Sequence, residues 1–192
     1  GDVVTQKSTS GAHLNVEGPN SRFPIIGRSK KQGCISVSTP EAEIVAGFVA
    51  YKEVFIPTVD LWETLLPKGY VSYFHEDNQA MIQVTRTGKN PTMRHLPRVH
   101  RVSVAWLHER LGKHDHRDPV EMVDTGTDFM AADIYTKAFT DPDKWSHAKS
   151  LINVIDPAKL DDLIENSRFA DRPDVPSKED DQIAQGDSAV QG

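Results

Sequence analysis

The sequence contains little that would hold a protein together covalently or place it in a membrane. Its only cysteine is Cys34, and one thiol cannot form an internal disulfide, so we expect no disulfide partner and a reducing compartment. The longest apolar runs, such as IVAGFVAY, fall far short of the ~20 residues that span a bilayer. The polar start GDVVTQKSTSG has no Met and reads like the middle of a domain, so we expect a fragment of a longer protein.

The sequence also lacks an excess of positive charge, and its excess of negative charge is confined to the C-terminal segment. The formal net charge is −6, and the segment from Asp156 to Gly192 alone has ten acidic and four basic residues, whereas residues 1–155 are neutral. Nucleic-acid-binding domains are often basic, so the overall charge gives that class no support. It does not exclude the class, because a metal-dependent site on nucleic acid is itself acidic. The 192 residues, 38% of them hydrophobic, suffice for one globular domain with a core.

Turn and periodicity signals predict a mixed α/β domain over residues 1–155. Two strands, at 11–17 and 23–29, flank a Gly-Pro-Asn turn at 18–20. The elements expected after them are a helix at 38–55, a short helix at 58–66, a strand at 70–77, helices at 78–87 and 96–112, a strand at 118–126, and helices at 127–139 and 141–155. This order differs from that of a doubly wound parallel sheet. The acidic tail at 156–192 is expected to be mostly disordered.

The stretch STPEAEIVAGFVA places two glutamates at the head of an apolar helix. The residues three, four and seven positions after Glu43 share its helix face and are all small: Ala46, Gly47 and Ala50. A face of small residues lets a helix lie close to a sheet, so Glu43 is expected to point toward a packed neighbour. Glu41 is rotated away from that face. We predict that Glu41 stabilises the helix end, and that its loss costs about 1 kcal/mol or less.

Two further acids stand out by their positions. Asp77 ends the strand predicted at 70–77, where it either caps the next helix or lies at the strand end where α/β sheets bind ligands. Asp133 lies among small and apolar neighbours in FMAADIYTKAF. Each of these acids alone could be a cap or a solvated charge. Together with Glu43 they form a set of carboxylates of the kind that binds Mg²⁺, and paired ions of this type serve in-line phosphoryl displacement.

Other polar groups give weaker signals. Several histidines suggest zinc, but they lack a partner cysteine and regular spacing, so a solvated loop is the competing interpretation; they are His95, His100, His108, His114 and His116. The basic turn GRSKKQG, with Lys30 and Lys31, could contact phosphates or simply be solvated. Cys34 is expected to pack rather than to act as a nucleophile. Three tryptophans at helical core positions are expected to be buried: Trp62, Trp106 and Trp145.

Five motifs in order resemble the ribonuclease H region of copia-type LTR retrotransposon polyproteins. GDVVTQKSTSG is similar to G-D-x-x-T-R-K-S-T-S-G, and SKKQGCISVSTPEAEIVA is similar to S-K-K-Q followed by S-S-T-E-A-E-Y-x-A. EDNQAMI resembles D-N-Q-x-A-I, and His95 and His100 match the histidines of H-x-R-T-K-H. VDTGTDFMAADIYTKAF resembles V-x-T-x-x-Q-x-A-D-I-x-T-K-A-L. The motifs extend over residues 1–155, and their combination is specific although each alone is weak.

The resemblance implies an RNase H-like fold, in which a mixed sheet is flanked by helices. It implies cleavage of the RNA strand of RNA–DNA hybrids with two Mg²⁺ ions. Glu43, Asp77 and Asp133 match the family's catalytic and metal-binding acids. Four residues are assigned to nucleic-acid contacts: Lys30, Lys31, Asn78 and Gln79. The implied partners are the hybrid and an upstream reverse transcriptase in the same polyprotein, and the implied location is a cytoplasmic virus-like particle or the nucleus.

The sequence also departs from the family pattern. Gly1 and Asp2 match the last two residues of S-D-A-D-W-A-G-D, so the first catalytic aspartate and the first strand are expected upstream of this chain. HLPRVHRV keeps both histidines but loses the Thr-Lys pair, and Ile44 replaces the usual tyrosine. We therefore expect little or no activity from the chain as given. The alternative is a decayed, non-catalytic RNase H-like remnant or binding module.

Overall fold

The computed structural model describes residues 4–19, 21–66, 70–112 and 118–160. The chain divides into two units, Gly1–Val154 and Ile155–Gly192. In the second unit the described residues form a single 3₁₀ turn, η5 (Pro157–Lys159), whose N-cap Asp156 accepts a hydrogen bond from the Ala158 N–H. Most of the predicted acidic tail lies outside the described residues.

The first unit begins with an antiparallel hairpin, β1 (Thr9–Gly18) and β2 (Ser21–Lys31), which is longer than the sequence predicted. The pairing runs from Thr9 opposite Lys31 to Gly18 opposite Ser21. Its register shifts between Leu14 and Asn15, where β2 contains one extra residue. A shift of this kind is a β-bulge, which bends the strands and increases their twist.

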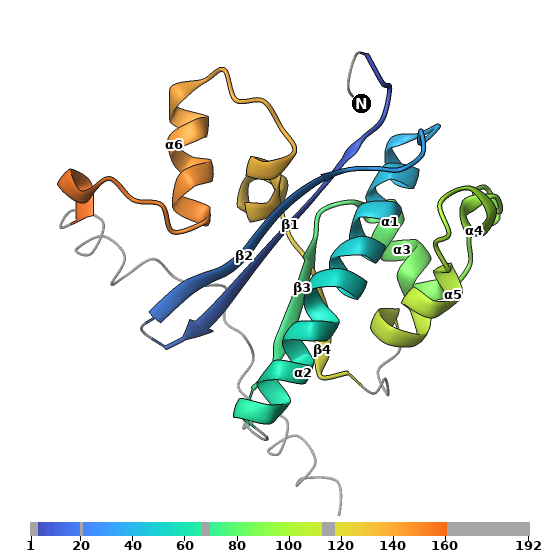
Figure 1. Ribbon diagram of the computed structural model, residues 1–192, viewed down its shortest axis with the longest axis horizontal. Coiled ribbons are helices and arrows are strands. Elements are labelled where there is room, and N and C mark those ends of the chain that lie inside the picture. The colour runs from blue at the N-terminus through green and yellow to red at the C-terminus, as the bar shows by residue number, and fades with distance from the viewer. Residues whose placement is uncertain (1–3, 20, 67–69, 113–117, 161–192) are drawn as a thin grey trace, which may run out of the picture. The chain divides into compact units, whose positions relative to one another are not determined.

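A second sheet pairs β3 (Ser72–Glu76) with β4 (Val120–Asp124) in parallel, and Ser72 lies opposite Val120. A parallel pair needs a long crossover, and here the crossover contains α3 (Gln79–Thr87) and the segment after it. Within the described residues the two sheets share no strand pairing. The structure is therefore a mixed α/β arrangement of small antiparallel and parallel sheets flanked by helices (Figure 1).

Helix α1 (Thr39–Ala50) follows the hairpin, and its N-cap Ser38 accepts a hydrogen bond from the Glu41 N–H. The helix continues through a π-helical turn, η1 (Tyr51–Phe55), into α2 (Ile56–Leu65). The break predicted after residue 55 is therefore absent. Pro57 follows directly after the π turn, where the regular i→i−4 hydrogen-bond pattern is already interrupted.

Helix α1 contacts both β1 and α3 and connects the hairpin to the main core (Figure 1). The core lies between α1, η1, α2, α3, β4 and the segment 96–111. Its buried members are all apolar except for the Tyr51 hydroxyl; they are Ile44, Val45, Tyr51, Phe55, Val59, Met81, Val84, Leu96, Val102, Leu107, Leu111 and Val120. That hydroxyl donates to Asp118 at 2.8 Å, which satisfies it. Among the described residues no helix is both long enough and apolar enough to cross a bilayer.

The single helix predicted at 96–112 is wrong. The segment forms α4 (Leu96–Val99), α5 (Val104–Leu107) and a π turn, η2 (His108–Gly112). Arg101, with φ = 58°, lies in the left-handed region and interrupts the helical path. The interruption turns the chain so that Val102 is buried at 1% exposure.

The single helix predicted at 127–139 is also wrong. Two 3₁₀ turns, η3 (Thr127–Phe129) and η4 (Ala131–Tyr135), are separated by Met130 in an extended conformation. Helix α6 (Pro142–Leu151) follows, and its N-cap Asp141 accepts a hydrogen bond from the Asp143 N–H. Trp145 on α6 is 43% exposed, so its predicted burial is also wrong.

Candidate functional site

Three carboxylates from three separate elements act on one another. Glu43 is on α1, Asp77 lies between β3 and α3, and Asp133 is on η4. Burial raises the pKa of Glu43, and the negative charges of Asp77 and Asp133 raise it further. Carboxylates affect each other in this way only when they are close enough for their charges to repel. Even so, within the described ranges no three His, Cys, Asp or Glu side chains form a group that could hold a metal ion.

Asp77 lies just after the end of β3, and Thr127 of η3 orients its carboxylate. The Thr127 hydroxyl donates to Asp77 Oδ2 at 2.8 Å. The cap of α3 is the next residue, Asn78, whose side chain accepts from the Met81 N–H. Of the two roles that the sequence left open for Asp77, helix capping is thus taken by Asn78.

Asp133 lies on η4 and forms an ion pair with Lys137. The Lys137 ammonium is 2.6 Å from Asp133 Oδ2, and the Lys137 N–H donates to the Asp133 carbonyl at 2.9 Å. Burial raises the pKa of Asp133, the hydrogen bond and charge of Lys137 oppose this rise, and the charge of Asp77 adds to it. The net direction is upward, so burial and acid–acid repulsion outweigh the lysine.

Two glycines of the hairpin leave the space in which η4 lies. A Cβ on Gly11 would lie 2.7 Å from the Ala132 carbonyl oxygen, and a Cβ on Gly27 would overlap the Tyr135 ring. The Ser29 hydroxyl donates to the Tyr135 carbonyl at 2.8 Å, which fixes the end of η4 on β2. The hairpin therefore sets the position of η4, and with it the position of Asp133.

Replacing Gly11 with alanine should lower the free energy of unfolding by about 2 kcal/mol, because the added methyl group would overpack this contact and push η4 away. Gly33→Ala is the matched control, since a Cβ on Gly33 has no atom within 4 Å. Urea unfolding of both variants measures the difference. Equal stabilities for the two variants would show that η4 moves aside without cost.

Glu76 was missed by the sequence analysis. It is 6% exposed at the end of β3, and its Oε1 accepts from the Asn78 N–H at 3.1 Å. Burial raises its pKa to about 8, with further increases from the charges of Glu43 and Asp77. The carboxyl is therefore mostly protonated at neutral pH. The signal was the strand alternation, which puts Phe74 and Glu76 on the inner face of β3.

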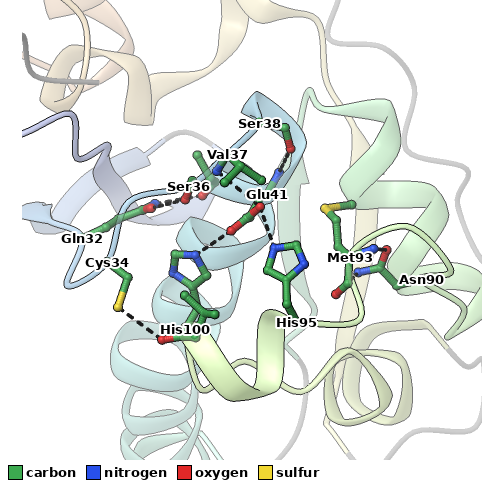
Figure 2. A network of polar contacts seen from close by, with 12 residues as sticks. Gln32, Cys34, Ser36, Val37, Ser38, Glu41, Asn90, Met93, His95 and His100 are labelled. Atoms are coloured by element: carbon green, nitrogen blue, oxygen red, sulfur yellow. Dashed lines mark hydrogen bonds and ion pairs between the residues drawn. The ribbon is translucent and has the colours of Figure 1, made fainter.

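The interpretation of Glu41 as a helix-end residue is confirmed only in part: its Oε2 accepts from the Val37 N–H, just before the helix, at 3.4 Å. Its side chain is fully buried and accepts hydrogen bonds from His95 Nε2 at 3.0 Å and His100 Nε2 at 2.7 Å (Figure 2). The N-cap and C-cap residues of α4 thus both bind one carboxylate on α1. Burial by itself raises the pKa of Glu41, but the two histidines outweigh it and hold the pKa below its usual value. Helix geometry pointed Glu41 away from Glu43, but it did not indicate what Glu41 would meet.

Further contacts stabilise the region around Glu41 and α4 (Figure 2). The Cys34 thiol donates to the Val99 carbonyl at 3.2 Å, a structural role that agrees with the sequence interpretation. His108 is engaged elsewhere, with Nδ1 2.9 Å from the Thr85 carbonyl oxygen. The histidines that suggested zinc are therefore divided between two structural contacts, and the pair at 114 and 116 lies outside the described residues.

Among the residues assigned to nucleic-acid contacts, Lys30, Asn78 and Gln79 form contacts within the fold. Lys30 lies 3.6 Å from Glu53, which also pairs with Arg28. Asn78 caps α3, and the Gln79 amide donates to both oxygens of Asp124 at 2.9 and 2.8 Å. Lys31 is exposed at the end of β2. A role of Lys30 and Lys31 in binding a polyanion stays a proposal.

The chain was compared with protein-family models, with curated proteins and with solved structures, and no match was found in any of the three.

Proposed function

We propose that this chain is the ribonuclease H-type part of a retrotransposon polyprotein and acts on the RNA strand of RNA–DNA hybrids. The observation that carries the proposal is the approach of three acids from separate segments: the charges of Asp77 and Asp133 raise the pKa of Glu43, and the charge of Asp77 raises that of Asp133. Proteins rarely gather like charges without a cation or a reaction that uses them. The motif resemblance over residues 1–155 supplies the reaction and the substrate class.

The RNase H-like fold is part of the same proposal. The antiparallel hairpin and the parallel pair β3–β4 are compatible with it, but a further strand would have to join them into one mixed sheet. The resemblance places that strand, and a fourth carboxylate, upstream of Gly1. An upstream reverse transcriptase, and a location in a cytoplasmic virus-like particle or the nucleus, follow from the same resemblance.

The donor chemistry of the acidic site suits Mg²⁺, which prefers carboxylate oxygens. Glu43, Asp77 and Asp133 would hold the ions, although the described residues do not by themselves form a closed ligand group. When bound, two Mg²⁺ ions supply activation of water and neutralisation of charge on the phosphate. The chain's own residues orient the acids: Thr127 positions Asp77, and the hairpin glycines position η4 and Asp133.

A second candidate is a non-catalytic RNase H-like remnant or binding module. It is favoured by the lack of a three-ligand group in the described part of the chain and by the lysine that occupies Asp133. The two candidates differ in whether Glu43 matters for turnover.

Cleavage of a labelled RNA–DNA hybrid in Mg²⁺ tests the proposal on the 192-residue chain and on a chain extended upstream through the expected acidic strand. The extended chain should cleave the hybrid, and Glu43→Gln should reduce its rate by about a hundredfold or more, as expected when a group that stabilises the transition state is removed. The 192-residue chain should show little or no cleavage.

Glu63→Gln is the control, since Glu63 is an exposed acid on α2. Cleavage that is equally fast in the Glu43→Gln and Glu63→Gln variants would exclude Glu43 from the site. No cleavage by the extended chain would favour the remnant. Robust, Glu43-dependent turnover by the 192-residue chain would show that no upstream carboxylate is required.

A further inference from the structure

The segment from Asn78 to His108, which contains α3, α4 and α5, has no acidic residue in 31 positions, although the chain as a whole has a net charge of −6. The same segment has five bases, which are Arg86, Lys89, Arg94, Arg98 and Arg101. All five are exposed, and none of them forms an ion pair with another residue in the described part of the chain. By contrast, Arg22, Arg28 and Arg110 each pair with an acid.

Three of these bases lie on one side of the turn that contains α4. Arg98 is in α4, and Arg94 and Arg101 flank the helix and its two capping residues. The spacings of four and three residues put the three side chains on one face of a helical turn. The opposite face is the buried one, where Leu96 is 0% exposed and the His100 side chain is 2% exposed. We call the exposed side, formed by Arg94, Arg98 and Arg101, the arginine face.

The turn that carries the arginine face is held from its buried side. His95 and His100, the caps of α4, both bind the buried carboxylate of Glu41 on α1 (Figure 2). The Cys34 thiol donates to the Val99 carbonyl at 3.2 Å. None of these contacts involves a guanidinium group of the arginine face, so the fold fixes the backbone of the turn while the three charges point outward.

This arrangement of charge is unfavourable without an anion. Like charges at i,i+4, such as those of Arg94 and Arg98, repel each other and destabilise a helical turn. Arg101 adds a backbone cost, because its φ of 58° lies in the left-handed region, which favours glycine over an arginine. Backbone strain of this kind gathers at functional sites, where the surrounding contacts hold it in place.

We propose that the arginine face binds the phosphate backbone of a nucleic-acid duplex. A guanidinium group presents paired N–H donors in a planar fork that matches the oxygens of a phosphate. Contacts to phosphates also need no groove or pocket in the protein, only outward-pointing cations in a fixed register. The inference goes beyond the proposed function, because a duplex-binding face would serve the nuclease and the non-catalytic binding module alike.

The surroundings of the arginine face favour a nucleic acid over an acidic protein. The binding energy of protein–protein interfaces comes mainly from aromatic and other large anchors that become buried. Between residues 78 and 108, all of which the structure describes, Val99 at 42% is the only exposed large apolar side chain. Recognition by this surface therefore depends on charge.

Fluorescence anisotropy tests the inference, with a labelled RNA–DNA hybrid titrated with the 192-residue chain in EDTA at about 50 and about 200 mM salt. Arg94→Gln/Arg98→Gln should bind about tenfold or more weakly at the lower salt, and the slope of log K against log salt should fall by about two, one for each lost phosphate contact. Arg94→Lys/Arg98→Lys keeps both charges and should keep the slope. Lys52→Gln/Lys144→Gln is the matched control, because it removes two exposed charges from η1 and α6, and it should stay close to the wild type.

Arg101→Gly separates binding from folding. Glycine suits the left-handed backbone at this position, so the midpoint of thermal unfolding should not fall, while the affinity for the hybrid should drop about fivefold at low salt. A loss of affinity that appears only in variants with a lowered midpoint would overturn the inference.

No binding by the wild type, or equal affinities and salt slopes for the wild type and the arginine variants, would also overturn the inference. Neither result would bear on cleavage by the extended chain, which tests the proposed function separately. Polyglutamate that binds as tightly as the hybrid, with the same loss in Arg94→Gln/Arg98→Gln, would assign the arginine face to acidic proteins and overturn its assignment to nucleic acid.

Discussion

Replacing Glu41 with alanine should lower the free energy of unfolding by about 3 kcal/mol or more, several times the cost of removing a surface acid. The carboxylate is fully buried and is the acceptor for both His95 and His100. His100 is itself only 2% exposed at its side chain, so the substitution would leave a buried imidazole N–H without its acceptor. Urea unfolding near neutral pH measures the loss.

Asp143→Ala is the matched control, since Asp143 is also an acid in the first turn of a helix but is exposed to solvent. Its loss should cost about 1 kcal/mol or less. Glu41→Gln should fall between the two, because the amide keeps one acceptor but loses the charge. A Glu41→Ala loss no larger than that of Asp143→Ala would mean that the histidine contacts contribute nothing beyond the helix-end effect.

The difference between Glu41 and Glu43 shows how far sequence periodicity reaches. The i+3, i+4 and i+7 positions put Glu43 on a face of small residues, and the structure places a buried acid, Glu76, beside that face: a Cβ on Gly47 would lie 3.7 Å from its Oε2. Periodicity also rotated Glu41 away from that face. It could not reveal that a distant segment, closed by an irregular turn at Arg101, brings two histidines to Glu41.

Turn and helix-cap residues in the sequence predicted the elements whose ends are set by contacts between neighbouring residues. The Gly-Pro-Asn turn predicted the hairpin, and the Ser38 and Asp141 caps mark the starts of α1 and α6 as expected. The two predicted helices that failed are those in which tertiary contacts override propensity. In one, burial of Val102 competes with a continuous helix, and in the other Met130 interrupts the chain so that η4 can lie against the hairpin glycines.

The candidate site was accessible to sequence reasoning only in part. Glu43, Asp77 and Asp133 were selected because acids in apolar or strand-end contexts are unusual. The sequence did not reveal the contacts that place these acids. Thr127, Gly11 and Gly27 lie far from them in the chain and meet them, or the segment that carries them, only in the folded structure. The ion pair of Lys137 with Asp133 was not visible either, since an i,i+4 pair looks the same on any surface.

Raising the pH from neutral to about 9 should destabilise the cation-free protein through Glu76. Its pKa is raised from the usual value to about 8 in the folded chain. The folded state therefore binds this proton more tightly than the unfolded state does. The stabilisation is fully present below the unfolded pKa of 4.5 and is lost as the pH rises through about 8. Between neutral pH and pH 9 the loss should be about 1 kcal/mol.

Glu76→Gln removes the titration while keeping an acceptor for the Asn78 N–H, so its stability should change less over the same range. Urea unfolding in EDTA at several pH values compares it with the wild type and with Glu121→Gln, an exposed acid on β4 that serves as the control. His13 and His75 do not interfere, since desolvation lowers their pKa values and they take up protons only as the pH falls below neutral. Parallel curves for the wild type and Glu76→Gln would show that Glu76 is already ionised in the folded chain at neutral pH. A curve for Glu76→Gln that stays level while the other two fall would establish a neutral carboxyl next to the acidic site.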